Sequence, residues 1–339
     1  MKKTIIQALK FLGFLALGVL LLFFAFRGIA VDELADTLRG ARWGWIGLSL
    51  LFALISFFLR ARRWVLLVEP LGYKPSYFNT YHALMIGYLS NYALPRLGEV
   101  TRCVTLGRRE KIPVDSLIGT VIVERVIDLV MLFLILLALL VSWVEKFGGF
   151  FGELVYAPIR QKAIDTFGGA WLLWVIIAAT LLLLLGMLYM LRSRLTHFLV
   201  YRKTREIILG ILKGLKTIYT MKGKWEFILH SLLIWFFYIL MTWMVVFALE
   251  ETAGLTFIDG MFLLVAGGLG MSAPVTAGFG AYHWITSRGL MFVYDFPLEV
   301  GGAYAILAHE SNSLLTILLG IISYLTMTLT RRKQTLMTA

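Results

Sequence analysis

The chain is poor in cysteine and in charged side chains. Cys103 is the single cysteine among 339 residues, which excludes an intramolecular disulfide and a cysteine-based metal site. Only 15% of the residues are charged, and no hydrophilic stretch is long enough to form a soluble domain. These absences exclude a disulfide scaffold and an attached globular domain within this sequence.

The motifs of common enzyme classes are also missing. The chain has no HExxH zinc motif, no G-x-S-x-G nucleophile elbow, no P-loop and no carboxylate cluster suited to two metal ions. We therefore expect no catalytic residues, no cofactor and no metal ion. An intramembrane enzyme acting on a lipid headgroup stays an alternative, because His, Glu and Arg side chains are present in apolar sequence.

Apolar sequence is what the chain has in abundance. Hydrophobic residues make up 60% of it and its mean hydropathy is +0.83, which indicates an integral membrane protein. The net charge of +12 can indicate nucleic acid binding, but the basic residues lie in short stretches between apolar runs. That distribution is typical of the positive-inside rule, so we expect membrane lipids as partners and no nucleic acid.

Six apolar segments are long enough to cross the hydrocarbon core, which needs about 20 residues each. The first is too long for the apolar region of a signal peptide and no cleavage site follows it. The fold class expected is therefore an all-α polytopic membrane protein. The six predicted spans are residues 5–27, 44–66, 117–143, 170–191, 226–249 and 302–329.

Two further apolar segments, residues 79–111 and 257–294, are each broken by a polar elbow with Gly and Pro. All the Lys and Arg clusters, including Arg60, Arg62 and Arg63, reach one side of the membrane only if both segments return to the side they entered. We therefore predict two re-entrant hairpins, with six crossings and both termini on the cytoplasmic side of the cytoplasmic membrane.

The order of elements predicts an inverted-topology repeat. Each half reads span, amphipathic piece, span, hairpin, span, and the two halves begin on opposite sides. The first amphipathic piece has Val31, Leu34, Ala35 and Leu38 on one face, and the second covers residues 198–219. The predicted divisions are a first half-repeat at 1–144, an extracytoplasmic linker at 145–168 and a second half-repeat at 169–339.

The two elbows are candidate binding sites, because irregular backbone in a bilayer is tolerated only inside protein or beside a wet cavity. Pairs of breaks in two halves are typical of transporter sites, and the helix that follows a break presents free N–H groups to an anion. The alternative is that the elbows serve packing alone, with Arg96 paired to Glu99. The elbow residues are Pro95, Gly98, Pro274, Gly278 and Gly280, and the candidate binding residues beside them are Asn91, Arg96, Glu99, Arg102 and Thr276.

Charged side chains also lie inside the third span. Glu124 and Asp128 are four residues apart and share a helical face, and Arg125 can pair with Asp128 three residues on. Charges within a membrane are costly unless paired or hydrated, so they are candidates for a functional site. A structural ion-pair network that fixes the hairpin to its neighbour, through Arg96 or Arg102, is an equal alternative.

The corresponding span of the second half carries His309, Glu310 and Asn312, and His283 follows the second elbow. A histidine beside a cavity can exchange a proton near neutral pH, which would allow proton coupling or gating. The alternative is that each histidine is a buried hydrogen-bonding residue. We include all four residues among the candidate substrate-binding residues.

Three stretches together resemble a known family. The first two have the patterns N-x-x-L-P-x-x-G-E-x-x-R and E-R-x-x-D, and the third is a Gly-rich elbow. They resemble the lysylphosphatidylglycerol synthase transmembrane-domain family, which includes the flippase half of bacterial multiple peptide resistance factors, over essentially the whole chain. The stretches are Asn91-Tyr-Ala-Leu-Pro95-Arg96-Leu-Gly98-Glu99-Val-Thr-Arg102, Glu124-Arg125-Val-Ile-Asp128 and Pro274-Val-Thr-Ala-Gly278-Phe-Gly280.

Three departures from the family pattern bear on the substrate more than on the fold. The elbow from Pro274 to Gly280 replaces a common Pro-Gly-Gly-x-Gly, His283 stands where an acidic residue is frequent, and His309 stands where an arginine is frequent. The aminoacyltransferase domain of the fused synthases is absent from this sequence. The chain is therefore not expected to synthesise lysyl lipids.

The resemblance implies a flippase that moves an amphiphilic lipid with an anionic headgroup across the cytoplasmic membrane. Arginines would compensate the headgroup charge and acids would hold the arginines in place. A small-solute secondary transporter and a non-transporting accessory protein of envelope-lipid biosynthesis are the alternatives, and the oligomeric state, a homodimer included, is left open. The arginines are Arg96, Arg102 and Arg125, and the acids are Glu99, Glu124 and Asp128.

Overall fold

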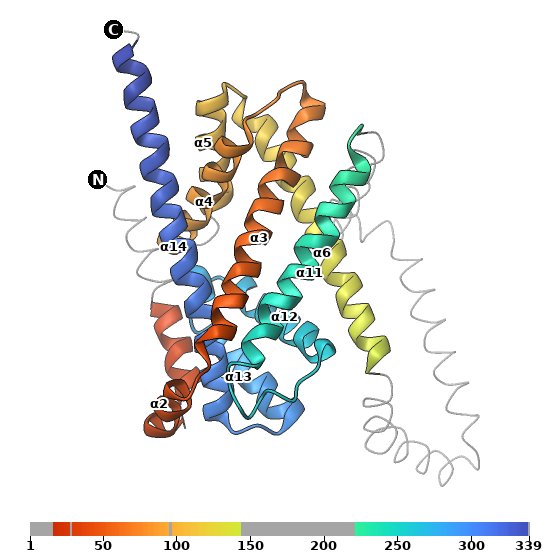
Figure 1. Ribbon diagram of the computed structural model, residues 1–339, viewed down its shortest axis with the longest axis vertical. Helices are drawn as coiled ribbons and strands as arrows, with labels where there is room; N and C mark the ends of the chain where they lie inside the picture. Colours follow the sequence, from red (N-terminus) through yellow and green to blue (C-terminus); the bar gives the residue numbers. More distant parts are fainter. Residues whose placement is uncertain (1–15, 28, 95–96, 144–220, 338–339) are drawn as a thin grey trace, which may run out of the picture. The chain divides into compact units, whose positions relative to one another are not determined.

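The computed structural model describes residues 16–27, 29–94, 97–143 and 221–337. Its contacts divide the chain into one unit of residues 1–135 with 217–339 and another of residues 136–216, and the fold below is that of the first. The described elements are helical throughout, and in these ranges there is no strand (Figure 1). They are Ala16–Phe26, α2 Val31–Arg39, α3 Trp43–Val68, η1 Glu69–Leu71, α4 Tyr77–Ala93, α5 Leu97–Glu110, α6 Val114–Ser142, α11 Lys224–Val246, α12 Phe257–Ser272, η3 Thr276–Gly278, α13 Ala281–Tyr294 and α14 Leu298–Met337.

Four of the described helices are long and apolar enough to cross a membrane, namely α3 continued by η1, α6, α11 and α14. They have between 23 and 33 residues in their apolar stretches, above the roughly 20 residues that a span requires. They coincide with four of the six predicted spans, which confirms a polytopic α-helical membrane protein. Of the other two, 5–27 is described only from Ala16 and 170–191 lies outside the described residues, so the number six stays a prediction.

Both broken segments are pairs of helices, as predicted. α4 and α5 pack against each other on either side of a break at Leu94, and α12 and α13 do so across residues 273–280. Pro95 and Arg96 lie outside the described residues. At the crossing of α4 and α5 a Cβ on Gly98 would overlap the carbonyl oxygen of Gly87, so the two backbones touch because both positions lack a side chain. Whether the pairs are re-entrant in a bilayer stays a prediction.

The second elbow needs left-handed backbone at three positions within four residues. Gly278 and Gly280 have φ of +75° and +77°, and Ala277 between Thr276 and Gly278 has φ of +49°. Glycine adopts such angles without the steric cost that other residues incur. The predicted Gly-rich elbow is therefore a true interruption of the helix, and it holds the short η3 turn between α12 and α13.

The long helix α14 joins the two hairpins. Its Gly301 meets the backbone of Ser287 on α13, and its Gly320 meets Leu89 on α4. Nineteen residues separate these contacts, or roughly 28 Å along a helix that rises about 1.5 Å per residue. The hairpins therefore pack at two different levels of α14. The two hairpins also meet directly, because η3 at the second elbow contacts α4 of the first hairpin. This arrangement is compatible with the predicted inverted repeat but does not establish it.

α3 and α11 lie side by side in the middle of the described unit (Figure 1). The predicted amphipathic piece near the N-terminus is helix α2, and Leu34 on its apolar face is buried among residues of α14 and α11. The second predicted amphipathic piece, residues 198–219, lies outside the described residues. The proposed division into half-repeats and a linker is likewise a prediction.

Candidate functional site

A buried cluster of charges joins α3, α5 and α6. Glu124 and Asp128 occupy successive turns of α6 and both face α3, as their four-residue spacing predicts. The side chain of Glu124 is 1% exposed and that of Asp128 is 15% exposed. Two carboxylates at this depth require cationic partners, because an unpaired buried charge is costly.

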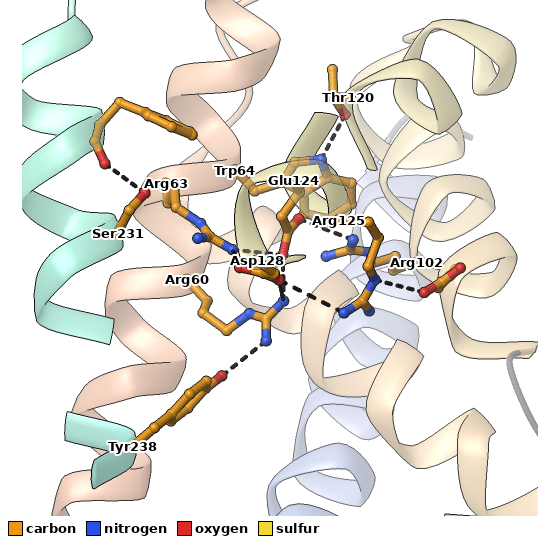
Figure 2. A network of polar contacts seen from close by, with 12 residues as sticks. Arg60, Arg63, Trp64, Arg102, Thr120, Glu124, Arg125, Asp128, Ser231 and Tyr238 are labelled. Carbon is orange, nitrogen blue, oxygen red and sulfur yellow. Dashed lines mark hydrogen bonds and ion pairs between the residues drawn. The ribbon is translucent and has the colours of Figure 1, made fainter. Parts of the chain in front are cut away.

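Three arginines supply those partners (Figure 2). Arg63 Nη2 lies 2.7 Å from Asp128 Oδ1 and 3.2 Å from Glu124 Oε1. Arg60 Nη2 lies 3.3 Å from Asp128 Oδ2 and also contacts Glu124 Oε1 directly. Arg102 Nη2 on α5 lies 3.0 Å from Glu124 Oε2 and its guanidinium stacks on the ring of Trp64. Glu124 thus contacts arginines from both α3 and α5.

Arg60 and Arg63 correct the sequence analysis, which placed them in a cytoplasmic basic cluster. Both are buried, and they are members of the charged site. The signal that identifies them is the apolar run of residues 64–68 that follows them, because α3 continues to Val68 rather than ending near 66. Two arginines three residues apart inside an apolar helix share a face and need acidic partners on a neighbouring helix.

The predicted pairing of Arg125 with Asp128 is present, with Nη1 3.7 Å from Oδ2. The closer partner of Arg125 is Glu99 on α5, whose Oε1 accepts from Nε at 2.7 Å. Glu99 therefore pairs with Arg125, whereas the packing alternative had paired it with Arg96. α6 is tied to the first hairpin through both Arg125–Glu99 and Arg102–Glu124, so the predicted structural network exists.

The described cluster carries more positive than negative charge. Its four arginines, Arg60, Arg63, Arg102 and Arg125, face three carboxylates, those of Glu99, Glu124 and Asp128. Arg60 Nη1 also donates a hydrogen bond to the hydroxyl oxygen of Tyr238 at 2.8 Å, and the guanidinium lies over the ring of Tyr88. These neutral partners do not cancel the surplus charge, so the cluster favours an anion at its open side.

That open side is a cavity of about 560 Å³. Its wall is formed by residues of α3, α4, α6, α11, α12, α13 and α14 together with Ala277 of the second elbow. Arg60, Arg125 and Asp128 line one part of it, and apolar side chains such as Leu129 and Leu264 line another. Its volume lies within the range of roughly 300–1,000 Å³ typical of small-molecule sites.

The structure separates the predicted site residues into those that line this cavity and those that do not. His309 and Asn312 of α14 reach the same cavity as the charged residues of α6, although the two sets are far apart in sequence. Thr276 and Glu310 do not line it, and Arg96 lies outside the described residues. The lining residues among those predicted are Asn91, Arg125, Asp128, His309 and Asn312, and those that do not line it are Glu99, Arg102, Glu124, Thr276, His283 and Glu310.

Several polar atoms in the cavity wall have no hydrogen-bond partner within the described protein. They are the Tyr88 hydroxyl, Trp235 Nε1, Asn312 Oδ1 and Arg60 Nε. Buried polar groups are rarely left unpaired, so this wall is suited to a polar ligand or water. No sequence pattern distinguished Tyr88, Trp235 or Tyr238 from the many aromatic residues of the apolar helices.

Asn91 has a structural role in addition to its place in the wall. Its side-chain Oδ1 accepts the backbone N–H of Gly98 at 2.7 Å, which satisfies one free donor at the start of α5. We expect Asn91→Ala to destabilise the first hairpin by about 1 kcal/mol, the usual cost of losing a capping acceptor. The thermal unfolding midpoint in detergent measures this effect, and Asn91→Asp, which keeps an acceptor, should lose less. Equal losses in both variants would contradict the capping role.

The second half contributes a smaller polar group. His283 near the start of α13 and His309 on α14 both contact the carboxylate of Glu310, at 3.2 and 3.0 Å. His309 also contacts the backbone oxygen of Ala277 at the second elbow. The sequence singled out all three residues, and the structure brings them together.

Comparison with known proteins gives two findings. The family described as the lysylphosphatidylglycerol synthase TM region matches residues 11–320 of this chain. A UPF0104 membrane protein of Methanocaldococcus jannaschii is 22% identical to it over 341 residues, which cover 96% of this chain and 94% of that protein. No solved structure matches.

Proposed function

The chain belongs to the family of the lysylphosphatidylglycerol synthase TM region, and from that premise we propose that it moves an amphiphilic lipid with an anionic headgroup between membrane leaflets. The proposal places the protein in the cytoplasmic membrane with both termini on the cytoplasmic side, as the distribution of Lys and Arg favours. The lipid would cross without covalent chemistry.

The observation that carries the proposal is a cavity with a cationic part and an apolar part. Arg60 and Arg125 line it beside a cluster with surplus positive charge, while Leu129, Leu132 and Leu264 line it elsewhere. Guanidinium groups bind phosphate and carboxylate oxygens through paired hydrogen bonds. Apolar side chains in the same wall suit the acyl chains of the same molecule. An amphiphile with an acidic headgroup therefore matches both parts.

The arginines divide into two roles in this proposal. Arg60 and Arg125 would contact the headgroup, since they line the cavity. Arg63 and Arg102 are almost completely buried and would hold Asp128 in the wall and Glu124 beside it in position. Glu99 would orient Arg125 through their 2.7 Å contact. Arg102 thus has a supporting role here rather than the direct one that the sequence suggested.

The test is lipid translocation in proteoliposomes, with labelled phosphatidylglycerol as the anionic lipid and phosphatidylcholine carrying the same label as the zwitterionic one. Arg125→Gln should slow translocation of phosphatidylglycerol about tenfold, equivalent to roughly 1.4 kcal/mol of lost stabilisation in the rate-limiting step. Its side chain is 45% exposed, so the variant should still fold. Arg39→Gln is the matched control, because Arg39 is 80% exposed on α2 and pairs with Asp36 one turn away.

Two other functions give different results in this experiment. If neither lipid moves but a small water-soluble anion such as phosphate enters the vesicles, the protein is a small-solute secondary transporter. If no substrate moves and a second protein co-purifies in fixed proportion, an accessory role is favoured. An unchanged phosphatidylglycerol rate in a folded Arg125→Gln variant contradicts the role given to Arg125.

A further inference from the structure

His283, His309 and Glu310 place three potential ligand atoms at one point between α13 and α14. His283 Nε2 lies 3.2 Å and His309 Nδ1 lies 3.0 Å from the same oxygen, Glu310 Oε1. The three ligand atoms lie within 4.8 Å of one another. Both imidazoles are fixed by burial, with exposed fractions of 2% and 5%, so this convergence does not depend on mobile surface side chains.

The hydrogen bonds around His309 leave its other nitrogen available as a ligand. His309 Nε2 lies 2.8 Å from the backbone oxygen of Ala277, which can only accept, so Nε2 must carry the hydrogen. In a neutral imidazole Nδ1 then has a lone pair, and this lone pair faces Glu310 Oε1, a second acceptor. Two acceptors 3.0 Å apart repel each other unless a cation lies between or beside them.

A metal ion satisfies this arrangement. A histidine that binds a metal through one nitrogen typically donates the other N–H to a carbonyl or carboxylate, which is the relation of His309 to Ala277. Two imidazoles and one carboxylate form a common catalytic zinc ligand set, with bonds of about 2.0–2.2 Å. Ligand atoms of a tetrahedral site are then roughly 3.3 Å apart. The two contacts to Glu310 Oε1, 3.0 and 3.2 Å, are close to that spacing, and the two histidine nitrogens, which lie within 4.8 Å of each other, would move closer together to bind one ion.

We propose that His283, His309 and Glu310 bind a divalent transition metal ion of the zinc class. Of the three ligands only His309 lines the cavity, so the ion would lie beside the cavity, at its His309 side. Three protein ligands leave a fourth position for water or for an oxygen of a bound molecule. This proposal is independent of the lipid proposed above, because it depends only on the three ligand residues.

The test uses the full chain, purified in detergent through a tag without histidine and stripped with a chelator. Titration with Zn²⁺ by isothermal calorimetry, checked by elemental analysis after desalting, should give one ion per chain. His283→Ala and His309→Ala should each weaken binding at least tenfold. His82→Ala is the matched control, because His82 contacts Ser323 at a different place and should leave binding unchanged.

A second measurement protects the test against variants that fail to fold. Co²⁺ added to the stripped wild-type protein should give the intense visible absorption of a tetrahedral site, and Zn²⁺ should displace it. Unaltered Zn²⁺ affinity in both folded histidine variants overturns the proposal, since binding is then adventitious. Absence of Zn²⁺ binding together with absence of the cobalt spectrum also overturns it, and the three residues then share a proton rather than a metal ion.

Discussion

Replacing Glu124 with glutamine is expected to lower the thermal unfolding midpoint more than neutralising any other single charged side chain in the described helices. Glu124 is 1% exposed and contacts Arg60, Arg63 and Arg102. Its loss leaves Arg60 and Arg63 with Asp128 as their remaining acid, and it removes the acid that Arg102 contacts. Removal of one partner from a buried ion pair costs about 3–5 kcal/mol, because the remaining charges stay desolvated.

The chain supplies its own reporter for this measurement. Cys103 is its single cysteine and is completely buried on α5, next to Arg102. A thiol-reactive fluorogenic dye therefore reacts only when this region opens, and its signal on heating gives the midpoint. Glutamine preserves the shape of the side chain, so a fall in the midpoint can be assigned to the lost charge.

The matched control is Glu226→Gln. Glu226 pairs with Arg62 at 2.7 Å, and this pair also joins α3 to a neighbouring helix, but its side chains are 40% and 36% exposed. Partly exposed pairs contribute about 0–1 kcal/mol, so the control should shift the midpoint little. If the two variants have the same midpoint, the buried cluster does not hold the described helices together.

Gly280→Ala is the second variant expected to have a large effect. Gly280 has φ of +77°, and a Cβ at this position would lie 2.5 Å from the backbone nitrogen of Leu22 and 2.6 Å from the oxygen of Gly18. Strained backbone and overpacking each cost about 1–3 kcal/mol, so we expect a loss of roughly 2–6 kcal/mol. The dye-based unfolding midpoint should fall accordingly, because the start of α13 can no longer pack against the helix Ala16–Phe26.

Gly119→Ala is the matched control for the added methyl group. Gly119 lies inside α6, and a Cβ there meets no atom within 4 Å. Alanine is favoured over glycine inside a helix by about 0.5–1 kcal/mol, so this variant should be slightly more stable than the wild type. Opposite signs for the two substitutions are expected, and a stable Gly280→Ala variant would contradict the tight contact at the second elbow.

The local elements were predictable because they follow from nearest neighbours in the chain. Four spans lie within a few residues of the predicted bounds, since an apolar run of about 20 residues has few alternatives in a bilayer. The breaks after Ala93 and Ser272 were equally evident, because Pro and Gly interrupt helices whatever surrounds them. The four-residue spacing of Glu124 and Asp128 likewise placed them on one face.

Partners far apart in sequence were not predictable. From the sequence, Arg60 and Arg63 were interpreted as charges on the cytoplasmic side. The structure pairs Arg63 with Glu124 and Asp128 of α6, which are more than 60 residues away in the sequence. The same holds for His283 and Glu310, which are 27 residues apart and meet only because α13 packs along α14. The expectation that the chain has no metal site rested on local ligand spacings, which carry no information about residues this far apart, and it stays a prediction.

The sequence alone determined that this protein lies in a membrane, where its two broken segments fall, and which charges lie within apolar helices. These features depend on composition and on spacing within single helices. The tertiary structure decided which charges neutralise one another and which face the cavity. Burial and ion pairing depend on contacts between helices, and a single sequence carries no record of those contacts.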